Sequence, residues 1–219
     1  MKKNISLLLL FVGMTVMSFA QLAEGKISYT MDFSSDNPDM AMGLAMMQGS
    51  KMEMNFVPGK SRTDVSMGSL GTMTTIADEK SKKVLTLMNM MGQKTAIEST
   101  TDKLPDAEKA PEYDVEITNE TKDILGYKCT KAIMTTDEGT AMTIWYTKDI
   151  VVATQGQNYY NSQMPGFPMA FNMTQSGMNI QMTVVGIEKK APSKSLFETK
   201  VPDGYTLQTM EELQKSMGQ

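Results

Sequence analysis

The chain has 219 residues, with 21 basic and 25 acidic side chains, one cysteine and no histidine. The lack of histidine excludes serine–histidine and cysteine–histidine catalysis, histidine-ligated zinc and a histidine pH switch. Methionine outnumbers leucine by 24 to 14, although leucine is normally among the commonest residues. This ratio indicates either a pliable apolar surface or a thioether metal site.

Residues 1–20 have the pattern of a secretory signal peptide. Two lysines precede an apolar core from Leu7 to Val12, and Ser18-Phe19-Ala20 supplies a small-x-small cleavage site. The apolar core is shorter than the roughly 20 residues that a membrane-spanning helix needs. A lipoprotein signal requires a cysteine directly after the cleavage site, and this chain has Gln21 there. We therefore expect a periplasmic or secreted protein without a lipid anchor or an integral membrane anchor.

The mature chain is acidic. Removing residues 1–20 takes away two lysines and no acid, so the remaining 199 residues carry 19 positive and 25 negative charges, a net charge of −6. Because nucleic-acid binding relies on a basic surface, we expect no nucleic-acid partner. The single cysteine, Cys129, cannot form an internal disulfide. We interpret it as a buried small hydrophobe, since a reactive thiol would also need an activating base.

Alternation of apolar and polar residues dominates the mature chain. Ile27, Tyr29, Met31 and Phe33 alternate with polar neighbours, which is the period expected of a strand with one buried face. Turn residues such as Pro58-Gly59 separate such segments. Short strands joined by hairpins predict a mainly β (α+β) fold with a large, strongly curved antiparallel sheet. The predicted strands are 26–33, 51–56, 60–67, 72–78, 83–90, 94–98, 114–118, 127–135, 141–146, 151–155, 169–174 and 180–188.

Two segments are predicted to be helices. Asn37 caps the first, with Pro38 at its first position and Gly49 after its end. The second begins with a capping box at residues 209–212 and places Met210, Leu213 and Met217 on one face. Because both helices have an apolar stripe to bury, we expect them to cover the sheet within a single domain, residues 21–219.

Three segments carry a resemblance to a known family. They are ILGYKCTK at 124–131, IWYTKDI at 144–150, and the run from SLFE at 195–198 to VPDGY at 201–205. With them the chain, from Gly25 to about Tyr205, resembles the exported family of domain of unknown function 4412 (DUF4412). That family is similar in fold to the periplasmic outer-membrane lipoprotein carriers LolA and LolB. The resemblance implies a LolA-like incomplete barrel with helices over an apolar cavity, and it supplies no catalytic residue.

We expect an apolar cavity that binds a lipid or acyl chain, as in a lipid or lipoprotein carrier. Methionine suits such a guest because its unbranched thioether adopts many rotamers and tolerates repacking. The alternative is that the methionines fill an ordinary packed core. The expected cavity residues are Met31, Phe33, Met52, Met54, Phe56 and Phe171, with Met40, Leu44 and Met47 on a lid helix, 38–48.

Two other functions stay open. Thioethers bind Cu(I), and the candidate clusters are Met88, Met90 and Met91, or Met40 and Met42 with Met46 and Met47. A cell-envelope protein partner is the other alternative, bound through an apolar loop that contains Tyr159, Tyr160 and the run 164–168.

An enzyme is not expected. The paired acids Asp78-Glu79 and Glu211-Glu212 fall in a turn and at a helix start, where acidic residues have local structural reasons to occur. No histidine is present to activate a serine, and no phosphate-binding glycine loop occurs. We therefore expect no catalytic residues and no cofactor.

Overall fold

The computed structural model describes residues 20–100, 113–136, 141–152, 166–175, 177–209 and 212. The predicted signal peptide, except for Ala20, and Tyr159, Tyr160 and residues 164–165 of the predicted apolar loop lie outside the described residues. Among the described residues, no helix has the length and hydrophobicity that crossing a membrane requires.

Most of the described chain is β-strand. Each of the twelve predicted strands has a counterpart, although residues 153–155 of one lie outside the described residues. The short strands β1 and β14 were not predicted, because three residues give no periodicity to detect. The strands are β1 (Ala20–Leu22), β2 (Gly25–Ser34), β3 (Ser50–Val57), β4 (Lys60–Ser66), β5 (Gly71–Asp78), β6 (Lys83–Met90), β7 (Gln93–Thr100), β8 (Tyr113–Ile124), β9 (Tyr127–Thr136), β10 (Ala141–Thr147), β11 (Ile150–Val152), β12 (Phe167–Gln175), β13 (Met178–Glu188) and β14 (Thr206–Gln208).

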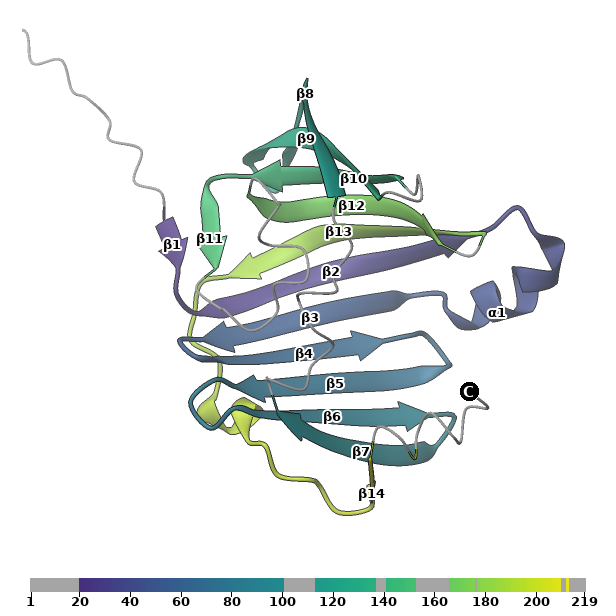
Figure 1. Cartoon of the computed structure of the whole chain (residues 1–219), viewed down its shortest axis with the longest axis vertical. Coiled ribbons are helices and arrows are strands. Elements are labelled where there is room, and N and C mark those ends of the chain that lie inside the picture. The colour runs from purple at the N-terminus through teal and green to yellow at the C-terminus, as the bar shows by residue number, and fades with distance from the viewer. Residues whose placement is uncertain are drawn as a thin grey trace, which may run out of the picture.

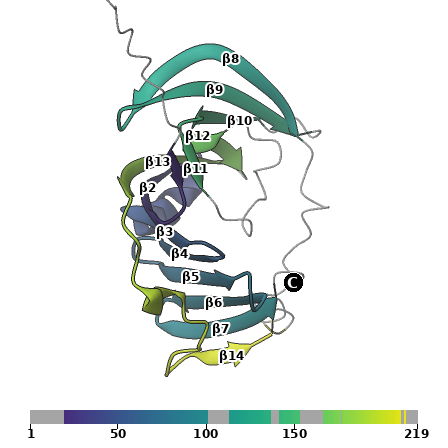
Figure 2. The same cartoon turned by 90° about the vertical axis from the view of Figure 1, so that its left-hand side faces the viewer.

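Twelve strands form one sheet in the order β14-β7-β6-β5-β4-β3-β2-β13-β12-β10-β9-β8. Strands β2 to β7 pair antiparallel in chain order, and a second antiparallel group contains β8, β9, β10, β12 and β13. The antiparallel pairing of β13 with β2 joins the two groups. The sheet curves strongly, so that its two ends approach the same side (Figures 1 and 2). This confirms the predicted mainly β fold with a strongly curved antiparallel sheet.

The two faces of the sheet differ in chemistry. Alternation along each strand and the register between strands place Ile27, Met54 and Ile187 together on one face. Ion pairs occupy the other face: Lys26 Nζ lies 2.6 Å from Glu188 Oε1, and Lys60 Nζ lies 2.9 Å from Asp78 Oδ2. One face is therefore apolar, as the sequence predicts, and the other is mainly polar.

The C-terminal segment identifies the polar face as the convex one. The short helix η3 (Lys194–Phe197) contacts β4 and β5, and it lies on the outer side of the curved sheet in Figure 2. Phe197 is 3 % exposed. Val201 and Tyr205 pack against an apolar patch formed by Leu85, Leu87 and Ala96 on the same face. The apolar face of the sheet is consequently the concave one.

The first predicted helix is shorter than expected. Asn37 Oδ1 accepts a hydrogen bond from Asp39 N at 3.0 Å, and Pro38 begins a 3-10 turn, η1 (Pro38–Met40). A six-residue helix, α1 (Ala41–Met46), follows, and Gly49 adopts a φ of +73° after its end. The predicted cap and terminus are therefore confirmed, whereas the single helix 38–48 is wrong.

The helix α1 does not cover the sheet, although the sequence predicts that it would. It lies beyond the ends of the strands in Figure 1, and Ser69 N donates to Met46 O at 2.8 Å, which ties α1 to the β4–β5 turn. Of the second predicted helix, the capping box is present: Glu212 N donates to Thr209 Oγ1 at 3.1 Å and Thr209 N donates to Glu212 Oε2 at 2.7 Å. Its apolar stripe, Met210, Leu213 and Met217, lies outside the described residues. In the described chain, the segment that covers the sheet is therefore the extended C-terminal one.

Cys129 is fully buried in the main hydrophobic cluster, as predicted. Its Sγ donates a hydrogen bond to the carbonyl oxygen of Tyr127 at 3.4 Å. Burial raises the pKa of the thiol, because the charged thiolate is poorly solvated there. The thiol form therefore predominates at neutral pH.

This environment makes Cys129 a slow nucleophile. Because the thiolate is the reactive form, we expect a chromogenic disulfide reagent to modify Cys129 in the native protein far more slowly than in guanidinium chloride. An added cysteine at the exposed Ser81 serves as the control and is expected to react quickly under native conditions. A native Cys129 that reacts as fast as this control contradicts the buried assignment.

Candidate functional site

The concave face carries two continuous apolar rows that run across the strands. One row crosses six neighbouring strands, each residue lying opposite the next in register. Its members include three methionines in succession. The row contains Val115, Met134, Met142, Met173, Ile180 and Phe33.

The other row lies on the half of the sheet built by β2 to β7. Met73 of β5 and Met88 of β6 are directly opposite each other in this row. Tyr29 at its start is 5 % exposed, and burial raises the pKa of its hydroxyl well above the usual range. The hydroxyl is therefore neutral at physiological pH. The full row is Tyr29, Met52, Val65, Met73, Met88 and Thr95.

Methionine and leucine are segregated between the two faces. Eleven methionines that have a register partner in the large sheet all lie on the concave face, whereas the leucines of β6 and β14 lie on the convex face. Leu85 and Leu87 belong to the patch under the C-terminal segment. The methionines are Met31, Met52, Met54, Met73, Met88, Met90, Met134, Met142, Met173, Met178 and Met182.

The concave face is uncharged over most of its width. From β2 to β7, and through β13, β12 and β10, the register-paired residues on this face include no acidic or basic side chain. Burial varies along the face: Met134 and Met182 are buried, whereas Met52, Met73 and Met88 are half-buried. The face therefore combines a packed layer with an accessible apolar surface.

The six predicted cavity residues share this face. Met31 and Phe171 both lie opposite Met182, on either side of β13. Phe56 is fully buried and belongs to the same cluster as Ile27, so it acts in the core rather than at the accessible surface. The other five are half-buried: Met31, Phe33, Met52, Met54 and Phe171.

The predicted lid residues lie apart from the concave face. Met40, Leu44 and Met47 are half-buried in and around η1 and α1, beyond the strand ends. The neighbouring Met42 is 79 % exposed. The structure therefore does not bring these three residues together with the six cavity residues.

The proposed copper ligands are divided between two locations. Met88 and Met90 lie on the concave face of β6. Met91 is in the following turn, is 81 % exposed and has a positive φ of 50°. The methionine that the structure brings opposite Met88 is Met73, which is distant in sequence.

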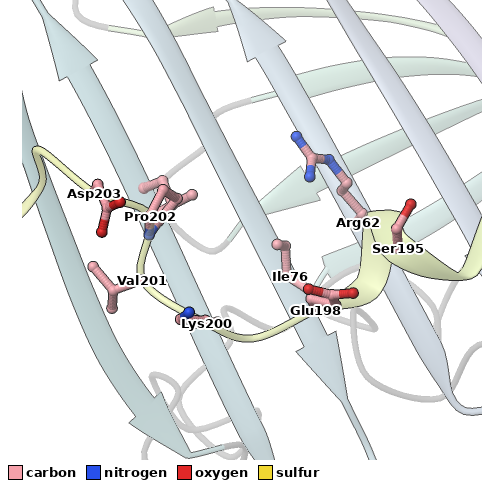
Figure 3. Close-up of a pocket in the computed structure, with 9 residues that line it drawn as sticks. Arg62, Ile76, Ser195, Glu198, Lys200, Val201, Pro202 and Asp203 are labelled. Carbon is pink, nitrogen blue, oxygen red and sulfur yellow. The ribbon is translucent and has the colours of Figure 1, made fainter.

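A pocket of about 330 Å³ lies on the opposite, convex face (Figure 3). Its walls are β4 to β6 and the C-terminal segment, and both charge signs occur at its rim. Arg62 is already neutralised there, because its Nε and Nη2 donate to the Asp64 carboxylate at 2.7 and 2.8 Å. Its Nη1 donates to Leu196 O at 3.3 Å and ties down the segment. The pocket residues are Arg62, Ile76, Leu87, Ser195, Glu198, Lys200, Val201, Pro202 and Asp203.

This pocket was not predicted from the sequence. It forms because residues 194–205 return across strands that lie far earlier in the chain. Conversely, Met73, Met142 and Met182 were missed as site residues, although the alternation of their strands places them on an apolar face. The register between strands, which no local pattern encodes, brings them into the rows.

Comparisons with known proteins place this fold in context. A solved structure of an uncharacterized conserved protein from Thermus thermophilus is 11 % identical, with a TM-score of 0.53, covering 85 % of this chain and 90 % of that chain. It supports the curved-sheet fold. The structure of PNGF-II in space group P21 is 16 % identical with a TM-score of 0.47; the match covers 90 % of this chain and 33 % of that chain. This chain therefore spans about a third of the PNGF-II chain.

A further solved structure is that of the lipoprotein LppX from Mycobacterium tuberculosis. It is 9 % identical with a TM-score of 0.39, covering 76 % of this chain and 88 % of that chain. A comparison with curated proteins finds no match. The family described as domain of unknown function (DUF4412) matches residues 30–205. The chain, with its methionine-lined curved sheet, therefore belongs to the DUF4412 family.

Proposed function

We propose that this protein is a non-enzymatic binding protein of the cell envelope, which holds a lipid acyl chain against its concave face. The observation that carries the proposal is the segregation of methionine onto that face, while the leucines Leu85 and Leu87 pack beneath the C-terminal segment. A core that only needs filling has no reason to separate the two residue types by face. A surface that must adapt to flexible guests does, because methionine repacks readily.

The dimensions and energetics suit an acyl chain. Neighbouring strands lie about 4.8 Å apart, so a row across six strands is about 24 Å long. Each methylene group removed from water contributes about 0.8 kcal/mol, against which the lost freedom of the guest must be set. The uncharged face lets an alkyl chain lie along a row without desolvating an ion.

A charge placed in the row tests the proposal. We expect Met73→Asp to weaken the binding of a dansyl-labelled fatty acid to the mature protein at least tenfold, because the carboxylate stays hydrated where the chain would lie. Fluorescence titration measures the affinity. Met73→Leu, which keeps the surface apolar, is expected to bind within about threefold of the wild type.

The matched control is Thr72→Asp, which places the same charge on the convex face of the same strand. It is expected to bind the probe like the wild type. Equal binding by both aspartate variants, or no binding by the wild type, contradicts the proposal. Copper is the alternative guest, because Met73 lies directly opposite Met88 and both thioethers suit Cu(I). Cu(I) retained by the wild type and lost in Met73→Leu, without fatty-acid binding, favours copper.

A further inference from the structure

We propose that three half-buried methionines in one row of the concave face are sulfoxidation sites, and that peroxides or hypohalous acids acting there abolish acyl-chain binding. This inference rests on the proposed function and adds a chemical control of the same site. It concerns Met52, Met73 and Met88, which belong to one row.

The structure sorts the methionines into three classes of accessibility. Met42 and Met91 are 79 % and 81 % exposed and lie away from the concave face. Met73 and Met88 are half-buried on that face. Met134 is fully buried. Because oxidation follows exposure, a mild oxidant is expected to modify the first class quickly, the second more slowly and Met134 last.

The chemistry needs no catalyst from the protein. The sulfur lone pair forms a bond to one oxygen of hydrogen peroxide while the O–O bond breaks. The sulfur loses two electrons and becomes a sulfoxide, and the peroxide is reduced to water. Hypochlorous acid removes the same two electrons: the sulfur takes up chlorine to form a chlorosulfonium ion, water displaces chloride from it, and the sulfoxide forms with the net release of one chloride and one proton. A methionine sulfoxide reductase, supplied with a thiol reductant, reverses the step.

A sulfoxide in this row changes the face from apolar to polar. Met73 and Met88 are opposite each other, with Val65 on the other side of Met73. An acyl chain across them would bury the sulfoxide oxygen without a hydrogen-bond donor, which is unfavourable. In the empty protein the same oxygen is within reach of water. Oxidation therefore opposes guest binding more than it opposes folding.

Within the large sheet, the two faces differ in their resistance to oxidation. Met52, Met73 and Met88 are half-buried on the concave face. Leucine, which does not undergo this reaction, is buried in the convex patch at Leu85 and Leu87. The half-buried oxidisable side chains of these strands thus lie on the face that would bind the guest.

The test follows oxidation and binding in the same sample. The mature protein is treated with increasing hydrogen peroxide, peptide mass spectrometry assigns each sulfoxide, and the dansyl-labelled fatty acid is titrated. Once Met52, Met73 and Met88 are oxidised, we expect at least a tenfold loss of affinity with an unchanged far-ultraviolet circular dichroism spectrum. Methionine sulfoxide reductase with dithiothreitol is expected to restore binding.

Two variants give the controls. The triple variant with Met52→Leu, Met73→Leu and Met88→Leu lacks the three sulfurs, so the affinity that it has for the probe before treatment is expected to be the same after oxidation. A variant with Met42→Leu and Met91→Leu keeps the three sulfurs of the row, so oxidation is expected to weaken its binding of the probe as much as it weakens that of the wild type. An untreated wild type that binds, and an oxidised one that binds equally well, overturns the inference and leaves the proposed function standing. If the untreated protein does not bind the probe, the proposed function is overturned, and with it the loss of binding on oxidation. The order in which the sulfoxides form still tests the modification sites.

Discussion

Replacing Phe56 by alanine is expected to lower the free energy of unfolding by about 3–5 kcal/mol. Phe56 is fully buried on the concave side of β3, and it lies opposite Gly25 on one side and Ser61 on the other. Both neighbours are small, so they cannot fill the space that the ring leaves. The expected loss therefore includes the cost of a cavity as well as that of the lost apolar burial.

Urea unfolding of a protein that begins at residue 21, followed by circular dichroism, measures this loss. Leu207→Ala is the control, because it also truncates a large apolar side chain but Leu207 is 56 % exposed. We expect this control to change stability by no more than about 0.5 kcal/mol. Equal effects of the two substitutions would show that Phe56 does not occupy a packed core position.

Gly71→Ala is expected to cost about 3 kcal/mol or more, because it combines two unfavourable effects. Gly71 begins β5 with a φ of +143°, which side chains other than glycine rarely adopt. A Cβ atom there would also collide with the carbonyl oxygen of Asn89 and lie 3.0 Å from the Cα of Met90. Both obstacles belong to the backbone of β6, so relief requires the two strands to separate.

Gly43→Ala is the matched control, measured by the same unfolding experiment. Gly43 lies in α1, and a Cβ atom added there meets nothing within 4 Å. Alanine stabilises a helix by roughly 0.5–1 kcal/mol relative to glycine. This variant is therefore expected to be at least as stable as the wild type. A Gly71→Ala protein with wild-type stability contradicts the close approach of β5 and β6.

Much of the fold could be predicted from alternation within single strands. Residues 26–33 show the pattern clearly and correspond to β2, and the turn at Pro58-Gly59 separates β3 from β4 as expected. Alternation also predicted which side chains share a face within a strand. It could not predict the pairing of β13 with β2, which lie more than 140 residues apart in the sequence, because strand register at that distance depends on the whole sheet.

The covering element shows the other limit of the sequence. Pro38 and Gly49 correctly predicted where a helical segment begins and ends, but apolar spacing at Met40, Leu44 and Met47 did not determine where the helix packs. Residues 194–205 show no strong periodicity, yet Phe197 and Tyr205 pack on the convex face. The sequence therefore predicted which residues lie on the concave face, but it did not predict the cross-strand rows that they form.

The most direct test of the acyl-chain proposal is to locate a bound chain. A fatty acid with a diazirine group near its methyl end is incubated with the protein and photolysed, and mass spectrometry identifies the labelled peptides. The proposal requires labels on concave-face residues of β3, β5 and β6, around Met52, Met73 and Met88, that unlabelled fatty acid suppresses. Suppressible labels at Ile76, Leu87 and Val201 in the convex pocket, or no suppressible label at all, would contradict it.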